Sequence, residues 1–117
     1  MAVTKAIPPE SLELYFAEFT QRFLKDGSPE AADVELLDPE MGDQVPVQGA
    51  RLIGISFDPK KQFLELEFDV GDHRIMDPGD VWAQEEPDGF VNSVAVMHRN
   101  GSREVIIIKH VGLRRLY

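Results

Sequence analysis

The side chains of this sequence that could do chemistry are histidines and carboxylates, because the 117 residues include no cysteine. His73 lies in the segment G-D-H-R-I-M-D-P-G-D, in which Asp77 and Asp80 follow it. A carboxylate near an imidazole can support general acid–base chemistry when both are enclosed in a cleft. The Asp-Pro-Gly-Asp segment is equally typical of a turn. We therefore predict a pocket or interface at His73, Asp77 and Asp80, and we assign no catalytic residue.

Other active-site motifs are absent from the sequence. His73, His98 and His110 do not show the H-x-H or H-E-x-x-H spacing of metal ligands. No serine stands in a G-x-S-x-G elbow, and neither of the glycine motifs that bind phosphate occurs. We therefore expect no metal and no cofactor. The sequence favours a protein that is not an enzyme, without deciding the question.

Trp82 is the only tryptophan, and it lies among polar residues between Asp80 and Glu86. A single aromatic side chain beside polar turns can be partly buried in a strand, or it can anchor an interface. Trp82 therefore joins His73, Asp77 and Asp80 as a candidate pocket or interface residue.

The net charge of −9 is distributed unevenly along the chain. Residues 1–50 carry a net charge of −7 and residues 51–90 of −6, whereas residues 91–117 carry +4. The candidate basic surface of the last segment consists of Arg99, Arg103, Lys109, Arg114 and Arg115. Nucleic-acid binding needs a basic field, because counterion release supplies much of its affinity. The acidic remainder of the chain therefore argues against nucleic acid as a partner.

The segment from about residue 9 to residue 25 predicts one amphipathic helix. Pro9 suits the first turn of a helix, and the helix dipole favours Glu10 and Glu13 there. Apolar and aromatic side chains recur every three or four residues, at Leu12, Tyr15, Phe16, Phe19 and Phe23. This spacing gives one apolar stripe, which we expect to cover the core of the protein.

After Gly27 the pattern changes to a period of two residues, which is typical of strands. It predicts strands at about 33–37, 52–57, 63–70, 73–84, 90–98 and 104–111. Residues 38–50 contain two prolines and two glycines and resemble a loop. Asn100-Gly101 predicts a hairpin turn, and the apolar segment after it predicts a strand that is central or closes a barrel.

Short turns between successive strands favour an antiparallel arrangement. We therefore predict an α+β fold, in which one N-terminal helix packs on a five- to six-stranded antiparallel meander or small barrel. Residues 1–117 would form a single domain. The longest apolar run is Val105 to Ile108, far shorter than a helix that spans a membrane. We expect a cytoplasmic protein that does not associate with membranes.

Three segments of the chain are similar to those of a known protein family. They are I-P-P-E-S-L-E-L-Y-F-A-E-F-T near the N-terminus, L-I-G-I-S-F-D-P in the middle and H-R-I-M-D-P-G-D-V after it. Together they resemble a family of small uncharacterised bacterial proteins, a domain of unknown function with an N-terminal aromatic helix and a following antiparallel sheet. The resemblance implies a bacterial, single-domain protein and no particular activity, cofactor or catalytic residue.

Three functions from different classes remain open. The first is a non-catalytic interaction or accessory domain that self-associates, by edge-strand pairing or by packing of complementary charges between copies. The second is a small ligand-binding protein or enzyme, with a pocket between helix and sheet near His73. The third is a small-barrel module that binds RNA through the basic surface. The absence of a catalytic motif favours the first, with a protein partner or a second copy of the chain.

Overall fold

The structure is a computed structural model that describes residues 2–25, 30–98 and 100–110. Its helical segment comprises a 3₁₀ turn at Pro9–Ser11, α1 at Leu12–Phe19 and a π-helical turn at Thr20–Leu24. The strands are β1 Val3–Ile7, β2 Glu30–Asp38, β3 Gly42–Asp58, β4 Phe63–Phe68, β5 Gly71–Met76, β6 Asp80–Glu85, β7 Val91–Met97 and β8 Arg103–His110. The α+β class with one N-terminal helix is confirmed, but the described sheet has eight strands rather than five or six.

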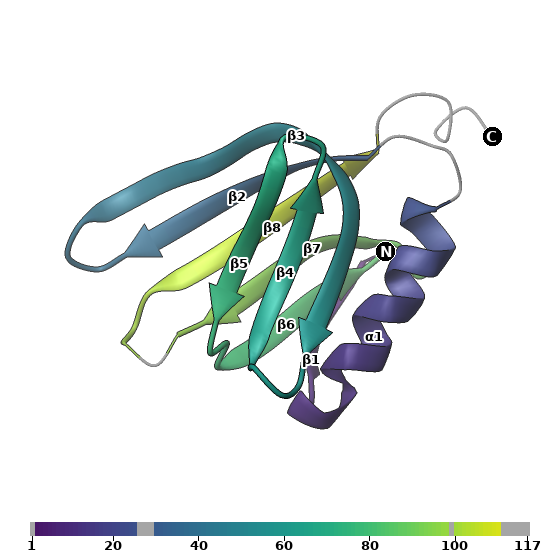
Figure 1. Cartoon of the computed structure of the whole chain (residues 1–117), viewed down its shortest axis with the longest axis horizontal. Coiled ribbons are helices and arrows are strands. Elements are labelled where there is room, and N and C mark those ends of the chain that lie inside the picture. The colour runs from purple at the N-terminus through teal and green to yellow at the C-terminus, as the bar shows by residue number, and fades with distance from the viewer. Residues whose placement is uncertain (1, 26–29, 99, 111–117) are drawn as a thin grey trace.

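The strands form one antiparallel sheet with the order β1-β6-β7-β8-β2-β3-β4-β5. The runs β2 to β5 and β6 to β8 each pair in chain order, and they join where β2 pairs with β8. The first half of β3 pairs with β2 and its second half pairs with β4. Figure 1 shows β5, β4 and the end of β3 lying in front of β8, β7 and β6. The sheet therefore folds over on itself into two layers.

The helical segment packs beside these layers by its aromatic stripe, as the spacing predicts. Leu12, Phe16, Phe19 and Phe23 are all buried. Phe19 and Phe23 contact the ring of Phe90, with centroids 5.8 and 5.4 Å away. The hydroxyl of Thr20 donates to the carbonyl of Ile55 in β3 at 2.9 Å and accepts from its amide at 3.0 Å. These contacts fix the helix against β3 and leave the far side of β6, β7 and β8 to solvent.

β1 is a strand that the sequence analysis did not predict. It pairs with β6 along its whole length, from Val3 opposite Glu85 to Ile7 opposite Val81. Only Ile7 of this strand is buried, so the segment lacks the hydrophobic alternation by which strands are recognised. Its partner β6 lies about 75 residues later in the chain, and backbone hydrogen bonds to such a partner leave no local pattern in the sequence.

The predicted loop at 38–50 is wrong. Its first residues form a short turn, in which the Asp38 carboxylate accepts hydrogen bonds from the amides of Glu40 and Met41. The rest belongs to β3, which is 17 residues long and contains Pro46 and Gly49. Irregular register between β2 and β3 accommodates these residues in the ladder. The segment forms an extended hairpin, and its residues from 39 to 46 are exposed (Figure 1).

The predicted strand at 73–84 is two strands, β5 and β6, which lie in different layers. The chain leaves β5 at Asp77, whose φ of 46° lies in the left-handed region. Gly79 then packs against the backbone of Met97 and donates a hydrogen bond of 3.1 Å to its carbonyl. The predicted strand at 63–70 ends at Phe68, and Val70 is 81% exposed in the turn after it.

The core lies between the two layers and the helix. Along β4, Leu64, Leu66 and Phe68 point into it, as their alternation with acidic residues predicts. β8 is central, between β7 and β2, also as predicted. Its side chains at Ile106 and Ile108 are buried, and so is Glu104 in the same inward register. An acidic residue therefore stands in line with the core residues of the central strand.

Candidate functional site

Glu104 is held between two histidines from different strands and layers. Its Oε1 accepts a hydrogen bond from His73 Nε2 at 2.8 Å, and its Oε2 accepts one from His98 Nε2, also at 2.8 Å. His73 belongs to the edge strand β5, whereas His98 follows β7 at the turn into β8. A carboxylate can only accept, so the Nε2 atom of each imidazole carries the proton. The bridge ties the free edge of one layer to the centre of the other.

The carboxylate of Glu104 is ionised at neutral pH. Burial by itself would raise its pKa, but the hydrogen bonds and charges of the two imidazoles outweigh burial and hold the pKa below its usual value. The side chain is 10% exposed, whereas those of His73 and His98 are 25% and 18% exposed. A buried charge of this kind is tolerated because both of its oxygens have donors.

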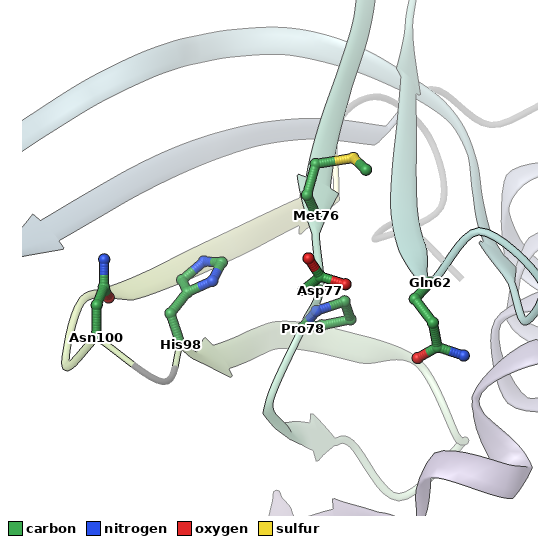
Figure 2. A pocket seen from close by; sticks show the side chains of 6 residues that line it. All are labelled: Gln62, Met76, Asp77, Pro78, His98 and Asn100. Carbon is green, nitrogen blue, oxygen red and sulfur yellow. The ribbon is translucent and has the colours of Figure 1, made fainter.

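A polar pocket of about 490 Å³ opens beside this bridge (Figure 2). It is lined by Gln62, Met76, Asp77, Pro78, His98 and Asn100. Gln62 and Asp77 are the two non-glycine residues with positive φ among the described residues, at 55° and 46°. The amide of Asp77 donates to the carbonyl of Gln62 at 2.8 Å, so each strained residue supports the other. Strained backbone persists where the surrounding structure determines it, and it is frequent at functional sites.

Two residues of the pocket, Asp77 and Gln62, present groups that accept hydrogen bonds. The Asp77 carboxylate has no ion pair or hydrogen bond to any described residue. Gln62 uses its amide nitrogen on the carbonyl of Pro59, which leaves its Oε1 atom as an acceptor. Asn100 also lines the pocket, and its Oδ1 atom accepts from the amide and hydroxyl of Ser102, which leaves its amide nitrogen as a donor. Figure 2 shows the His98 ring between Asn100 and Asp77. The Asp77 carboxylate and Gln62 Oε1 suit a ligand that carries N–H or O–H donors.

The structure distributes the predicted site residues over three places. His73 lies on Glu104, whereas Asp77 lines the polar pocket with His98 in place of His73. Asp80 and Trp82 line another pocket, of about 270 Å³, with residues of β1 and the two prolines after it. The bridge and the pocket therefore depend on His98 and Glu104, which sequence reasoning did not select. One signal was available, because Glu104 is the only acidic residue in 91–117 and shares the inward register of an apolar strand.

A pocket between the helix and the sheet also exists, but no histidine lines it. Lys5, Tyr15 and Glu85 meet in this pocket of about 280 Å³. The Glu85 carboxylate accepts from the Tyr15 hydroxyl and pairs with Lys5 Nζ at 3.0 Å. Burial, together with this hydrogen bond and the Glu85 charge, raises the pKa of Tyr15. The network joins α1 to β6 and β1, and all of its charged groups already have partners.

Trp82 lies on the opposite side of the sheet, which we call the outer face. The outer face is formed by three rows of side chains that run across the strands in register. The Asp80 row is Asp80, Met97, Arg103 and Leu37; the Trp82 row is Ala6, Trp82, Ala95, Val105 and Glu35; the Gln84 row is Thr4, Gln84, Ser93, Ile107 and Asp33. All of these side chains are half-buried or exposed, and Trp82 is 43% exposed.

The candidate basic surface lies only partly within the described residues. Arg103 and Lys109 are exposed on β8, and Lys109 Nζ contacts Asp33 Oδ2 at 3.4 Å. Arg99, Arg114 and Arg115 lie outside the described residues. Within residues 2–25, 30–98 and 100–110, no group of three or more histidine, aspartate or glutamate side chains could hold a metal ion. No helix in that part of the chain is long and apolar enough to cross a bilayer.

Comparison with known proteins places this chain in a family. The chain belongs to the DUF5335 family of unknown function, whose model matches residues 3–112. It is 36% identical over 107 residues to an uncharacterized protein of Aquifex aeolicus (strain VF5), covering 91% of this chain and 92% of that protein. No solved structure matches it. The resemblance to a bacterial family of unknown function is therefore confirmed.

Proposed function

We propose that this member of the DUF5335 family is a non-catalytic interaction domain that self-associates through its outer face. The observation that carries the proposal is the exposure of Trp82, which is 43% exposed between two alanines of the neighbouring strands. Its neighbours across the ladder are Ala6 on β1 and Ala95 on β7, so no larger side chain covers its ring. Tryptophan is one of the residues most enriched among the hot spots of protein interfaces.

The apolar surface of Trp82 that a partner would cover is large enough to support the same function. Covering the exposed 43% of Trp82 removes enough apolar surface to contribute about 2 kcal/mol per copy. Met97, Val105 and Ile107 extend the apolar surface on either side of Ala95. We also propose that the protein acts in the bacterial cytoplasm, in line with the bacterial source of its relative. Cell fractionation tests this location.

Sedimentation equilibrium of the wild type and of Trp82→Ala tests the proposed function. We expect a concentration-dependent dimer for the wild type, and a dissociation constant at least about tenfold higher for the variant. Leu14→Ala is the matched control, because Leu14 is 65% exposed but lies on the helix. A wild type that stays monomeric at millimolar concentration refutes self-association, and an equal effect of both substitutions refutes the role of the outer face.

A second candidate function is the binding of a small ligand in the polar pocket. It is favoured by the two mutually supporting strained residues, Gln62 and Asp77, and by a His98 ring fixed by Glu104. Because the pocket offers an acceptor beside the Asp77 carboxylate, which has no partner among the described residues, a cationic amine is the class of ligand that it suits.

Nuclear magnetic resonance titration with putrescine, and with propionate as the matched anion, tests this second function. We expect saturable shifts of the Asp77 and His98 amides with the amine alone. Asp77→Asn should abolish them while keeping the fold, because asparagine tolerates positive φ. Shifts that are equal for the amine and the anion, or that persist in the variant, contradict a ligand site here.

A further inference from the structure

We infer that the partner at the outer face is a second copy of this chain, packed face to face about a two-fold axis that runs along β7. The inference rests on the proposed self-association and adds its geometry. It comes from the positions of charged and apolar side chains in the three rows of the outer face. These positions make the face complementary to itself in one orientation.

β7 lies in the middle of the three strands that carry the pattern. β6 is its neighbour on one side and β8 on the other. When two such faces meet about an axis parallel to β7, β6 of one copy lies over β8 of the other. The axis does not shift the copies along the strands, so each row faces the same row of the partner. This is the isologous arrangement that a two-fold axis requires.

The apolar row fits this arrangement. Ala95, the small residue on β7, faces its own counterpart at the axis and allows close approach of the two sheets. Trp82 on β6 then faces Val105 on β8 of the second copy, and the reverse contact forms on the other side of the axis. In the row beside it, Met97 faces Met97. Each of the two Trp82 side chains in the dimer therefore lies over an apolar residue of the other copy.

Two charges of the outer face, those of Asp80 and Arg103, fit the same arrangement, whereas Glu35 faces Ala6 at the edge of the patch. Asp80 and Arg103 are the ends of the β6-β7-β8 part of one row, with Met97 between them. Neither makes an ion pair within the described residues of one copy. About the axis along β7, Asp80 of each copy faces Arg103 of the other, which gives two ion pairs per dimer. Packed sheets cross at about 30°, which displaces these residues by about 4 Å, within the reach of an arginine.

The alternative two-fold axis, across the strands at Ala95, does not give this match. It would place Asp80 over Gln84 and Arg103 over Ile107, so that both charges would lose water without gaining a partner. Burial of an unpaired charge opposes association. The charges therefore select the axis along β7.

The area of the outer face limits how tightly two copies can bind. Three rows across five strands cover roughly 20 by 24 Å, from the spacing of residues and strands in a sheet. This patch is smaller than the roughly 800 Å² per partner of a standard stable interface. The dimer should therefore be weak and depend on protein concentration.

Charge exchange between Asp80 and Arg103 tests the register. Asp80→Arg and Arg103→Asp each replace two attractive contacts by two repulsive ones, so we expect each to raise the dissociation constant about tenfold. The double variant restores both pairs and should return to within about threefold of the wild type. Asp72→Arg, an equal charge change on the exposed part of β5, is the control that should leave the dimer unchanged.

Mixing the two single variants gives the decisive measurement, because in a heterodimer of Asp80→Arg with Arg103→Asp both contacts are again between opposite charges. We expect the mixture to form more dimer than either variant alone, as measured by sedimentation velocity with one species labelled. Suppose that the wild type dimerises and that Trp82→Ala weakens the dimer, but that the mixture stays monomeric. This result would overturn the register about β7 and leave the proposed self-association standing. A wild type that never dimerises would overturn both the register and the proposed function. If only proline substitutions in β1 abolish the dimer, it forms by edge pairing and the inference fails.

Discussion

At the scale of single residues, Glu104 links the two layers of the fold. Its carboxylate joins His73 of the edge strand β5 to His98 beside β8, and it is ionised within the protein. Hydrogen bonds to a charged group contribute about 1.5–3 kcal/mol each, so loss of the charge affects both contacts. The bridge gives the edge strand β5, which pairs only with β4 among the described strands, a side-chain contact to the other layer. Glu104 thus stabilises the closure of the two layers.

Glu104→Gln should lower the free energy of unfolding at pH 7 by about 1–3 kcal/mol, because a neutral amide bonds two imidazoles less well than a carboxylate does. Since the folded protein lowers the pKa of Glu104 from its usual 4.5, the stabilisation is complete above about pH 4.5. It is lost as the pH falls through the lower pKa of the folded state. Urea unfolding from pH 7 to pH 3 should show the two proteins converging in acid.

Glu65→Gln is the matched control for this prediction, because Glu65 pairs with Arg74 at the surface, where the arginine is 58% exposed. Such pairs contribute about 1 kcal/mol or less. Equal losses for both variants, or a difference between wild type and Glu104→Gln that grows in acid, would show that the bridge does not stabilise the fold.

Residue chemistry could be predicted only in part. The segment around His73 was selected from the sequence, because a histidine near carboxylates is visible locally. Its actual partner, Glu104, lies 31 residues away and meets it only because two layers face each other. His98 lies only six residues before Glu104, across the predicted hairpin turn at Asn100-Gly101, but the sequence does not show that both side chains point inward. Proximity in space between strands of different layers carries no spacing signal.

At the scale of elements, the crossover from β5 to β6 is the point that builds the two layers. It occupies three residues, Asp77 to Gly79, between an edge strand of one layer and a strand of the other. Gly79 packs so closely that a Cβ atom there would collide with the carbonyl oxygen of Met97. The glycine is therefore required by contact with β7 and not by its φ angle.

Gly79→Ala should destabilise the protein by about 1–3 kcal/mol, because the backbone must shift to remove the collision. Gly54→Ala is the control, since its Cβ would meet the nearest atoms, Glu67 Oε1 and Thr20 Cγ2, at 3.4 and 3.5 Å, which is ordinary contact. Thermal and urea unfolding of both variants measure the difference. If the two variants were equally stable, the crossover would have more space than the contact with Met97 indicates.

Elements with a strong local pattern were predicted well. The aromatic stripe from Leu12 to Phe23 predicted the helix, and the alternation around Leu66 predicted β4, because burial of one face imposes a period on the sequence. β1 and the first half of β3 lack such a period, so the sequence does not predict them as strands. Both are largely exposed on their two sides, so their extended form comes from pairing with β6 and β2.

At the scale of the whole molecule, the folding over of one eight-stranded sheet decides which side of each strand is core and which is surface. β6, β7 and β8 are covered on their inner side by the other layer and the helix, and they present the outer face to solvent. The fold also brings the two oppositely charged parts of the sequence together on this face. Arg103, from the basic segment 91–117, lies in one row with Asp80, from the acidic segment 51–90. The proposed dimer depends on this placement.

The sequence by itself determined the fold class, the helix, the central place of β8 and the absence of thiol chemistry. Each of these follows from composition or from a local period that burial imposes on neighbouring residues. Only the tertiary structure decided the eight-stranded order, the contact of Glu104 with His73 in the other layer and the rows of the outer face. Those depend on pairing between distant strands, such as β1 with β6 and β2 with β8, whose backbone hydrogen bonds are the same for almost any side chain.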